Sequence, residues 1–491
     1  MEGQTTLFYL QGDSYMTTMT KKLTLFAAIL GLICFSLVSC GDLLNGIAGG
    51  AGGSSSAQSP VVTTPDETSF SIHYGATATL SITATVDDRG TLSYQWYKGT
   101  SNNRDNASPI TGATSASYIV TAPNAEVAKT YYWCKVTNTK SGTTGYNWYY
   151  DFDVTVSNII RLGGEYISSN TTWDATYTYY ISSWVDVERS LVIPAGTVIK
   201  FKNGAYFETS DSGTITVQGT EENPVIFTSY LDDVGITIPE FANSATSATK
   251  GDWKGVRIDG AAGSKIEYAV FRYSDEFALK LRDKKTTVNH CVFTDNKSNN
   301  DFSGALIIEE NANESVVTNN VFYNNDYPLL VSANYSVDTS NVFHNPDDAE
   351  VKNVNQAIVM DGAKYIEQSQ IVNWKVTELP YFLKNSWVDV ETGGTLNIGD
   401  DTNDVIVKFN NGCWIEISDK ANFTLGAGSI LTSWKDDANG GDIENNGQPA
   451  DPESGDWDGI QIEGAEKWGW ANSINMDEDR VLYNDKSKYQ D

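Results

Sequence analysis

The chain repeats a long stretch of its own sequence, and this repeat limits the possible folds more than any other feature. The pentapeptide Trp-Val-Asp-Val-Glu at 184–188 returns at 387–391, and Gly-Asp-Trp-x-Gly at 251–255 returns at 455–459. The two offsets nearly agree (387 − 184 = 203 and 455 − 251 = 204). Landmarks that share one register over such a distance indicate a tandem duplication, which we place at about residues 165–275 and 370–480.

A shorter period runs between the two copies. Val-Phe pairs at 270–271, 292–293, 321–322 and 342–343 are spaced 22, 29 and 21 residues apart. The surrounding sequence consists of short apolar runs divided by Asn, Gly and Asp, with no convincing amphipathic helix. This pattern is typical of coils that stack on one another, so residues 159–491 are predicted to form a right-handed parallel β-helix.

Equivalent positions of successive coils should stack into columns. The phenylalanines are expected to form an interior ladder. A second column is predicted at Ala269, Cys291, Asn320 and Asn341, and turn asparagines are predicted at Asn296, Asn325 and Asn345. An asparagine in a turn can satisfy backbone groups with its amide. Cys291 and Cys413 are then expected in the core, as small buried hydrophobic residues.

Residues 1–40 are predicted to be an export signal. Lys21 and Lys22 precede an apolar run at 23–38, which is shorter than the roughly 20 residues of a membrane-spanning helix. The run ends in Leu-Val-Ser-Cys, which resembles the lipobox of bacterial lipoproteins. That resemblance implies that Cys40 becomes the lipidated N-terminus and anchors the chain to the bacterial cell envelope, at the outer membrane or the cell surface.

Two further segments flank this signal. Met16 or Met19 would start a signal of normal length, so residues 1–18 are expected to lie upstream of the true start. Residues 41–60 are rich in Gly and Ser, and this composition predicts a flexible tether.

Residues 61–158 are predicted to form short antiparallel strands, because apolar residues alternate there between Gly, Asn and Asp. A Trp at 96 followed by Tyr-x-Cys at 132–134 resembles the immunoglobulin fold. The resemblance implies that Trp96 is the core tryptophan and Tyr132 the tyrosine corner. Ile82 stands about where the cysteine partner of Cys134 would fall, so no inter-sheet disulfide is expected.

The β-helix region also resembles a family. Ile-Pro-Ala-Gly-Thr at 193–197, Asn-Pro-Val-Ile-Phe at 223–227 and Gly-Asp-Trp-x-Gly at 251–255 are similar to motifs of bacterial cell-surface right-handed β-helix proteins. The resemblance covers about residues 165–465. The fold class expected from the whole sequence is therefore all-β, with an immunoglobulin-like β-sandwich followed by a right-handed parallel β-helix solenoid.

The net charge and the position of the acidic residues limit which partners and cofactors are expected. The formal net charge of −30 repels nucleic-acid phosphates, so no nucleic-acid partner is expected. The loop before the second Gly-Asp-Trp is crowded with carboxylates and amides, which are ligands that calcium prefers. The candidate calcium ligands are Asp436, Asp437, Asp442, Glu444 and Asn446. A solvated acidic loop without a metal explains the same composition.

The favoured function is that of a non-catalytic, surface-anchored lipoprotein for adhesion, which binds glycans or extracellular proteins. The densest group of aromatic residues is the candidate ligand-binding set: Trp173, Tyr177, Tyr179 and Tyr180. Such rings can stack on sugars, but they would equally serve as a layer that caps the first coil.

Two alternatives stay open. One is a polysaccharide-active enzyme of pectate-lyase-like fold. A lyase would need calcium-binding carboxylates beside an Arg or Lys base, and a glycoside hydrolase would need a pair of carboxyls that face one bond. The residues that supply these groups in one stretch are Asp275, Glu276, Lys280, Arg282 and Asp283. The other alternative is a purely structural envelope protein without a ligand.

Overall fold

In the computed structural model, the described residues are 56–242, 247–283, 285–298, 303–360, 365–400, 402–444, 447, 451–462, 473–475 and 478–484. The predicted signal, Cys40 and most of the tether lie outside this set. Strands dominate the described residues, which otherwise contain only the short 3-10 helices η1 (Arg104–Asn106), η2 (Pro239–Phe241) and η3 (Glu478–Arg480). Within the same set, no helix has the length and apolar character needed to cross a membrane.

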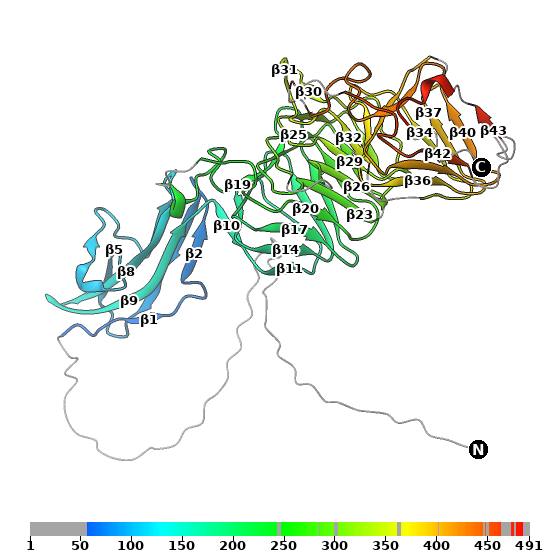
Figure 1. The fold of residues 1–491 in the computed structure, drawn as a ribbon. Helices are drawn as coiled ribbons and strands as arrows, with labels where there is room; N and C mark the ends of the chain where they lie inside the picture. The colour runs from blue at the N-terminus through cyan, green and yellow to red at the C-terminus, as the bar shows by residue number, and fades with distance from the viewer. Residues whose placement is uncertain are drawn as a thin grey trace, which may run out of the picture. The chain divides into compact units, whose positions relative to one another are not determined.

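The N-terminal part of the described chain consists mainly of antiparallel strands around one core. The larger sheet contains β2 (Ser69–Ile72), β9 (Thr143–Val156), β8 (Val127–Lys140), β5 (Thr91–Gly99) and β6 (Ser108–Pro109), in that order. Two smaller sheets pair β3 (Thr77–Ser81) with β7 (Ser117–Thr121), and β1 (Val61–Thr63) with β4 (Thr83–Thr85). Figure 1 shows these strands in blue and cyan.

Trp96 lies at the centre of this N-terminal core. Its side chain is fully buried, and its indole nitrogen donates to the carbonyl oxygen of Ser115 at 2.9 Å. Cys134 pairs in register with Trp96 on the neighbouring strand and carries a free, buried thiol, while Ile82 is 5% exposed. The likeness of this region to the immunoglobulin fold stays a prediction.

The rest of the described chain forms the parallel β-helix that the sequence predicts. From β10 to β27 each coil contributes one strand to each of three sheets. The first sheet contains β10 (Ile159–Leu162), β13 (Thr178–Ile181), β16 (Val198–Phe201), β19 (Val225–Ser229), β22 (Ala269–Arg272), β25 (Val292–Thr294) and β28 (Val321–Tyr323). The third sheet contains β12 (Thr171–Thr172), β15 (Ser190–Pro194), β18 (Thr214–Gln218), β21 (Lys265–Glu267), β24 (Thr287–Asn289) and β27 (Val316–Thr318).

The second sheet is the longest and runs through both copies of the repeat, as the row of strands in Figure 1 shows. Its strands are β11 (Glu165–Ile167), β14 (Trp184–Val187), β17 (Tyr206–Thr209), β20 (Val256–Ile258), β23 (Leu279–Asp283), β26 (Leu306–Asn311), β29 (Leu329–Val331), β32 (Ile358–Met360), β35 (Tyr381–Leu383), β38 (Ile406–Phe409) and β41 (Ile430–Ser433).

New sheets accompany the second copy. The fourth sheet contains β33 (Tyr365–Ile366), β36 (Trp387–Val390), β39 (Trp414–Ile417) and β42 (Gly459–Ile462). The fifth contains β34 (Ile371–Trp374), β37 (Thr395–Ile398), β40 (Asn422–Leu425) and β43 (Ser473–Asn475). A hairpin of β30 (His344–Asn345) and β31 (Asp348–Lys352) precedes them.

The duplicated strands do not occupy the same faces. β16 in the first sheet has the sequence Val-Ile-Lys-Phe, and its counterpart β38, with Ile-Val-Lys-Phe, lies in the second sheet. In the same way β14 lies in the second sheet and β36, with the identical sequence Trp-Val-Asp-Val, lies in the fourth. The second copy is therefore turned by one face relative to the first.

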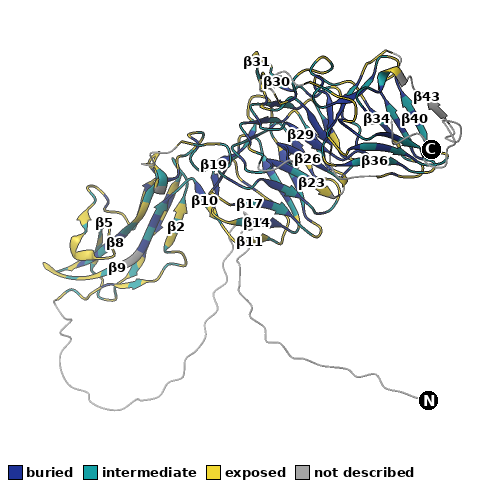
Figure 2. Cartoon of the chain, viewed as in Figure 1, coloured by how far each residue is buried: buried dark blue, intermediate teal, exposed yellow. Residues whose placement is uncertain are grey.

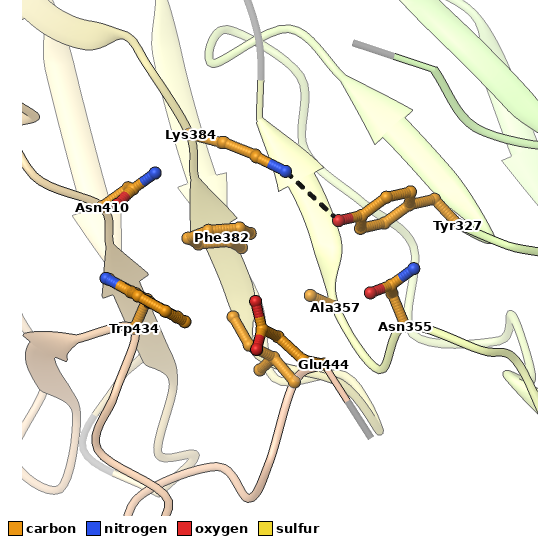
Figure 3. Close-up of a pocket in the computed structure, with 9 residues that line it drawn as sticks. Tyr327, Asn355, Ala357, Phe382, Lys384, Asn410, Trp434 and Glu444 are labelled. Carbon is orange, nitrogen blue, oxygen red and sulfur yellow. Dashed lines mark hydrogen bonds between the residues drawn. The ribbon is translucent and has the colours of Figure 1, made fainter. Parts of the chain in front are cut away.

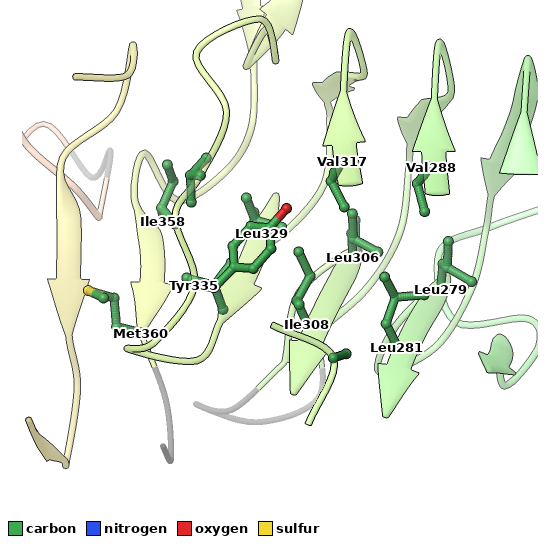
Figure 4. Close-up of a cluster of buried hydrophobic side chains, with 14 of the residues drawn as sticks. Leu279, Leu281, Val288, Leu306, Ile308, Val317, Leu329, Tyr335, Ile358 and Met360 are labelled. Atoms are coloured by element: carbon green, nitrogen blue, oxygen red, sulfur yellow. The ribbon is translucent and has the colours of Figure 1, made fainter. Parts of the chain in front are cut away.

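Aliphatic and aromatic side chains fill the interior, as the dark-blue strands in Figure 2 and the cluster in Figure 4 show. The predicted phenylalanine ladder is confirmed. Phe271, Phe293, Phe322 and Phe343 stack with ring centroids 5.1, 4.9 and 5.3 Å apart. Phe227 extends the ladder below Phe271 at 4.6 Å. Each ring covers the next because the parallel strands hold equivalent residues in register.

Buried asparagines form two ladders beside the phenylalanines. The predicted column is confirmed where the amide oxygen of Asn320 accepts from the backbone of Cys291 at 2.9 Å, and that of Asn341 accepts from the Asn320 amide at 3.0 Å. In the turn ladder, the Asn325 oxygen accepts from the Asn296 amide at 2.8 Å.

The third member of the turn ladder differs from the prediction. The Asn325 amide donates to the side-chain oxygen of Asn353 at 3.0 Å, whereas the oxygen of Asn345 accepts from the backbone of Asp347 in an exposed turn. The physical reason is the hairpin of β30 and β31, which lies between Phe343 and the turn that closes this coil.

We predict that Asn325→Ala lowers the free energy of unfolding by about 3 kcal/mol, because several buried polar groups each lose a hydrogen bond. The groups that lose a partner are the Asn296 amide, the carbonyl of Phe293 and the side-chain oxygen of Asn353. Asn345→Ala is the matched control and should change stability by less than about 1 kcal/mol. Urea denaturation of both variants measures the difference, and equal losses would contradict the assignment.

Candidate functional site

The repeated Thr-Ser and Gly-Asp-Trp motifs make the same hydrogen bonds and the same ring contact in both copies. We call this set of contacts the lock. In the first copy the Thr228 hydroxyl donates to Asp232, and the Ser229 hydroxyl donates to Asp252 at 2.6 Å. Trp253 then stacks on Phe201 of the coil below, with ring centroids 4.1 Å apart. The lock closes both ends of the long loop that separates β19 from β20.

The second copy repeats these contacts. The Thr432 hydroxyl donates to Asp436 at 2.6 Å, and the Ser433 hydroxyl donates to Asp456 at 2.7 Å. Trp457 stacks on Phe409 with ring centroids 4.1 Å apart. The motifs that reveal the duplication therefore hold the inserted loops against the solenoid.

A buried lysine lies under each lock. The ammonium group of Lys200 donates to the carbonyl oxygen of Asp232 at 2.7 Å, and that of Lys408 donates to the carbonyl oxygens of Asp436 and Gly441 at 2.8 and 2.6 Å. Burial lowers the pKa of Lys200 to about 8, although nearby carboxylates such as Asp232 oppose the shift. Burial lowers the pKa of Lys408 as well.

We predict that burial of Lys200 makes stability depend on pH. Its pKa is about 8 in the folded chain and 10.5 ordinarily, so the unfolded chain binds more protons between these values. The free energy of unfolding should therefore rise with pH from about 8 to 10.5, by up to about 3 kcal/mol relative to Lys200→Met.

Denaturation at several pH values tests this expectation. Lys202→Met, a change at an exposed neighbouring position, is the matched control and should follow the wild type. A Lys200→Met profile parallel to the wild type would contradict a buried, titrating amine.

The predicted calcium ligands are largely bonded within their own loop. The buried carboxylate of Asp436 also accepts from the Asn439 amide at 2.8 Å. Asp442 accepts from the backbone of Glu444 and Gly447 at 3.0 and 2.9 Å. Asn446 lies outside the described residues, and within them no group of three or more His, Cys, Asp or Glu could hold a metal ion. Calcium binding by this loop stays a prediction.

The aromatic residues predicted to bind a ligand are mostly buried. Trp173 and Tyr179 stack on each other at 3.9 Å inside the solenoid and are 7% and 4% exposed. Tyr180 is 6% exposed and packs with Ile159, while Tyr177 is half-buried. Three of the four rings are therefore not available as a platform, because Trp173 and Tyr179 fill the interior and Tyr180 packs against the loop that contains Ile238 and Phe241.

The residues weighed for an enzyme form ion pairs. Lys254 pairs with Asp275 and Glu276 at 3.0 and 3.5 Å. The other basic residues pair between strands, Lys280 with Glu309 at 2.5 Å and Arg282 with Asp259 at 2.9 Å. The side chain of Asp283 lies outside the described residues.

A pocket that the sequence did not predict lies on the outward side of the second sheet, where the second copy begins (Figure 3). We call it the aromatic pocket. Its lining comes from the turns around β29, β32, β35 and β38 and from the acidic loop: Tyr327, Asn355, Ala357, Phe382, Lys384, Asn410, Trp434, Ile443 and Glu444.

The floor of the aromatic pocket is apolar and its rim is polar. Ala357, Phe382 and Ile443 are almost fully buried, and half-buried Trp434 packs against them. The Lys384 amine donates to the Tyr327 hydroxyl at 3.3 Å and lies over both the Tyr327 and Phe382 rings. An apolar floor with a few placed polar groups is typical of small-molecule sites, but the cavity volume of about 60 Å³ is below the roughly 300–1,000 Å³ of most ligand pockets, so it can enclose only part of a ligand.

One sequence signal could have found this pocket. Trp434 follows the second Thr-Ser pair, where the first copy has Tyr230. The sequence predicts a metal site or a solvated loop around Trp434 and assigns no role to its ring. Glu444, proposed as a calcium ligand, is an exposed member of the pocket rim.

Comparison with known proteins gives one match. Residues 164–269 match the family model of the pectate-lyase like beta helix domain. No curated protein and no solved structure matches the chain. The matched segment lies within the first copy and supports the parallel β-helix, which is a polysaccharide-related fold.

Proposed function

We propose that this chain is a non-catalytic surface lipoprotein that binds glycans through the outward side of its β-helix. The aromatic pocket carries the proposal, because it combines Trp434, Phe382 and Tyr327 with the amides of Asn355 and Asn410. Aromatic faces stack on the apolar faces of sugars, and amides bond their hydroxyls. Calcium held by the acidic loop would brace the wall that contains Glu444.

The partners follow from the same proposal. Lipid on Cys40 attaches the chain to the bacterial envelope, at the outer membrane or cell surface, and the N-terminal β domain acts as a spacer. The charge of −30 argues against a nucleic-acid partner. An extracellular protein is the other ligand class considered.

We predict that Trp434→Ala weakens glycan binding at least tenfold, equivalent to about 1.4 kcal/mol, because it removes the stacking ring. Tyr230→Ala is the matched control, since Tyr230 holds the equivalent motif position but packs on Phe241 outside the aromatic pocket. Glycan-array retention followed by calorimetry measures both variants. Binding that is equal in Trp434→Ala and wild type would exclude this pocket.

One observation favours the enzyme alternative. Burial raises the pKa of Glu208, although its partner Arg257, 3.1 Å away, opposes the shift, and a carboxyl with a raised pKa can act as an acid. The assay is to incubate the protein with acidic and neutral polysaccharides and to look for new reducing ends or unsaturated products. Turnover on any of them would replace the binding proposal, whereas retention without turnover supports it.

We predict that lipid attachment depends on Cys40. Cells grown with a labelled fatty acid should label the wild-type chain and leave Cys40→Ser unlabelled, because the thiol is the acceptor in the lipoprotein pathway that the motif resembles. Cys134→Ser is the control and should keep the label. A labelled Cys40→Ser chain would contradict the anchor.

A further inference from the structure

The two copies share outward-facing residues as well as core residues. In the first copy these lie on β14, β17 and β20, which run side by side in Figure 1. Their counterparts lie on β36, β39 and β42 of the fourth sheet. The matched pairs are Trp184 and Trp387, Asp186 and Asp389, Tyr206 and Trp414, Glu208 and Glu416, and Gly255 and Gly459. We call each set an aromatic–carboxylate face.

Core packing does not account for this similarity, because alternate residues of a strand point to opposite sides. Val185 and Val187 fill the interior, so Trp184 and Asp186 point to the opposite side of the strand, where Trp184 is half-buried and Asp186 is 8% exposed. On the neighbouring strands of the third and fifth sheets, three outward positions have changed between copies, Ser190 to Thr395, Val192 to Asn397, and Thr214 to Asn422, whereas Thr216 and Thr424 are the same residue type. The aromatic–carboxylate faces have kept their rings and carboxylates, whereas Arg257 beside Glu208 is replaced by Gln461 beside Glu416.

In the first copy this face borders a hollow. Trp184 and Tyr206 are register neighbours, and Tyr206, Gly255 and Arg257 line the hollow with Phe277. Gly255 has a φ of +96°, and a Cβ there would lie 2.3 Å from the carbonyl oxygen of Phe277. A side chain at this position would therefore collide with Phe277, which lines the hollow together with Tyr206.

The carboxylates of this face are held in place. The Ser210 hydroxyl lies 2.8 Å from both oxygens of Asp186, and Arg257 pairs with Glu208 at 3.1 Å. Glu208 keeps about a quarter of its side-chain surface exposed (24%) beside the aromatic pair.

The second copy holds the corresponding residues in register, and here the two rings stack on each other, whereas Trp184 of the first copy packs edge-on against Tyr166. Trp387 and Trp414 stack with ring centroids 4.9 Å apart and planes 2° from parallel, and both are half-buried. The Trp414 indole nitrogen lies 3.4 Å from Glu416, and the Ser418 hydroxyl lies 3.4 Å from Asp389, as Ser210 does to Asp186. Gly459 has a φ of +87° and continues the row beyond Trp414.

We propose that the aromatic–carboxylate faces are two equivalent saccharide sites, which make the chain bivalent for neutral polysaccharides. Paired rings offer stacking surface, and the flanking carboxylates accept hydrogen bonds from sugar hydroxyls. The same carboxylates repel uronates and sulfated sugars. The inference takes its ligand class from the proposed glycan binding, but its residues are separate from those of the aromatic pocket.

The two sites open on different faces of the solenoid, because one lies on the second sheet and the other on the fourth. A polysaccharide chain lying along one face meets only one of them. The protein is therefore expected to cross-link separate polysaccharide chains, and avidity for a polymer should exceed the affinity of one site by about 10²-fold or more.

The test uses the full chain in detergent, with a Trp434→Ala change to silence the aromatic pocket. Calorimetry with xyloglucan and galactomannan oligosaccharides should find two sites per chain on at least one of these probes. The pair Trp184→Ala and Tyr206→Ala should leave one site, the pair Trp387→Ala and Trp414→Ala should leave the other, and all four changes should leave none. Tyr146→Ala removes an exposed ring of the N-terminal domain and should leave both sites.

Charge selectivity is measured with polygalacturonate, which should bind at least tenfold more weakly than the neutral polymers. Glu208→Gln and Glu416→Gln keep the packing and should reduce the difference in affinity between neutral polymers and polygalacturonate. They therefore test the inference even if the tryptophan variants fail to fold.

Two sites that survive the four alanine changes, or preference for polygalacturonate, would overturn the bivalent assignment alone. Loss of all binding in Trp434→Ala would also overturn it and leave the aromatic pocket supported. A wild-type chain that binds no glycan would overturn both proposals.

Discussion

Register between parallel strands is the constraint on which the rest of the β-helix depends. Each coil repeats the hydrogen-bonding pattern of the coil below. A residue type at one position of a coil therefore lies next to the same position of the following coil. The phenylalanine and asparagine ladders follow directly from this register. Insertions are tolerated only in the turns between strands, as in the loop between β19 and β20, and the Thr-Ser and Gly-Asp-Trp locks fix such loops to the core.

Features that depend on local spacing were predictable from the sequence. The coils and the phenylalanine ladder follow from a repeated Val-Phe period, and Asn296 and Asn325 each stand three residues after their phenylalanine. The prediction failed at Asn345 because a hairpin intervenes, and the ladder continues at Asn353, ten residues after Phe343. When a hairpin interrupts the coil, residue spacing cannot show which of two nearby asparagines lies in the ladder.

The candidate sites were harder to predict, because they depend on how separate coils meet. The aromatic pocket takes its lining from several turns and the acidic loop, whose paths no local pattern describes. The stretch with Trp173 and Tyr179 was aromatic enough to suggest a surface platform, but the structure turns both rings inward. The outward pair Trp387 and Trp414 lies far apart in sequence and becomes adjacent only through strand register.

The turn of the second copy by one face has a consequence for how such surfaces evolve. The length of the segment between β28 and β35 determines on which face the strands of the second copy begin. Shortening that segment by one strand and its turn would bring both repeats into alignment on a common side. A short deletion in a connecting coil can therefore place the two aromatic–carboxylate faces on one side of the solenoid. None of the residues of these faces needs to change.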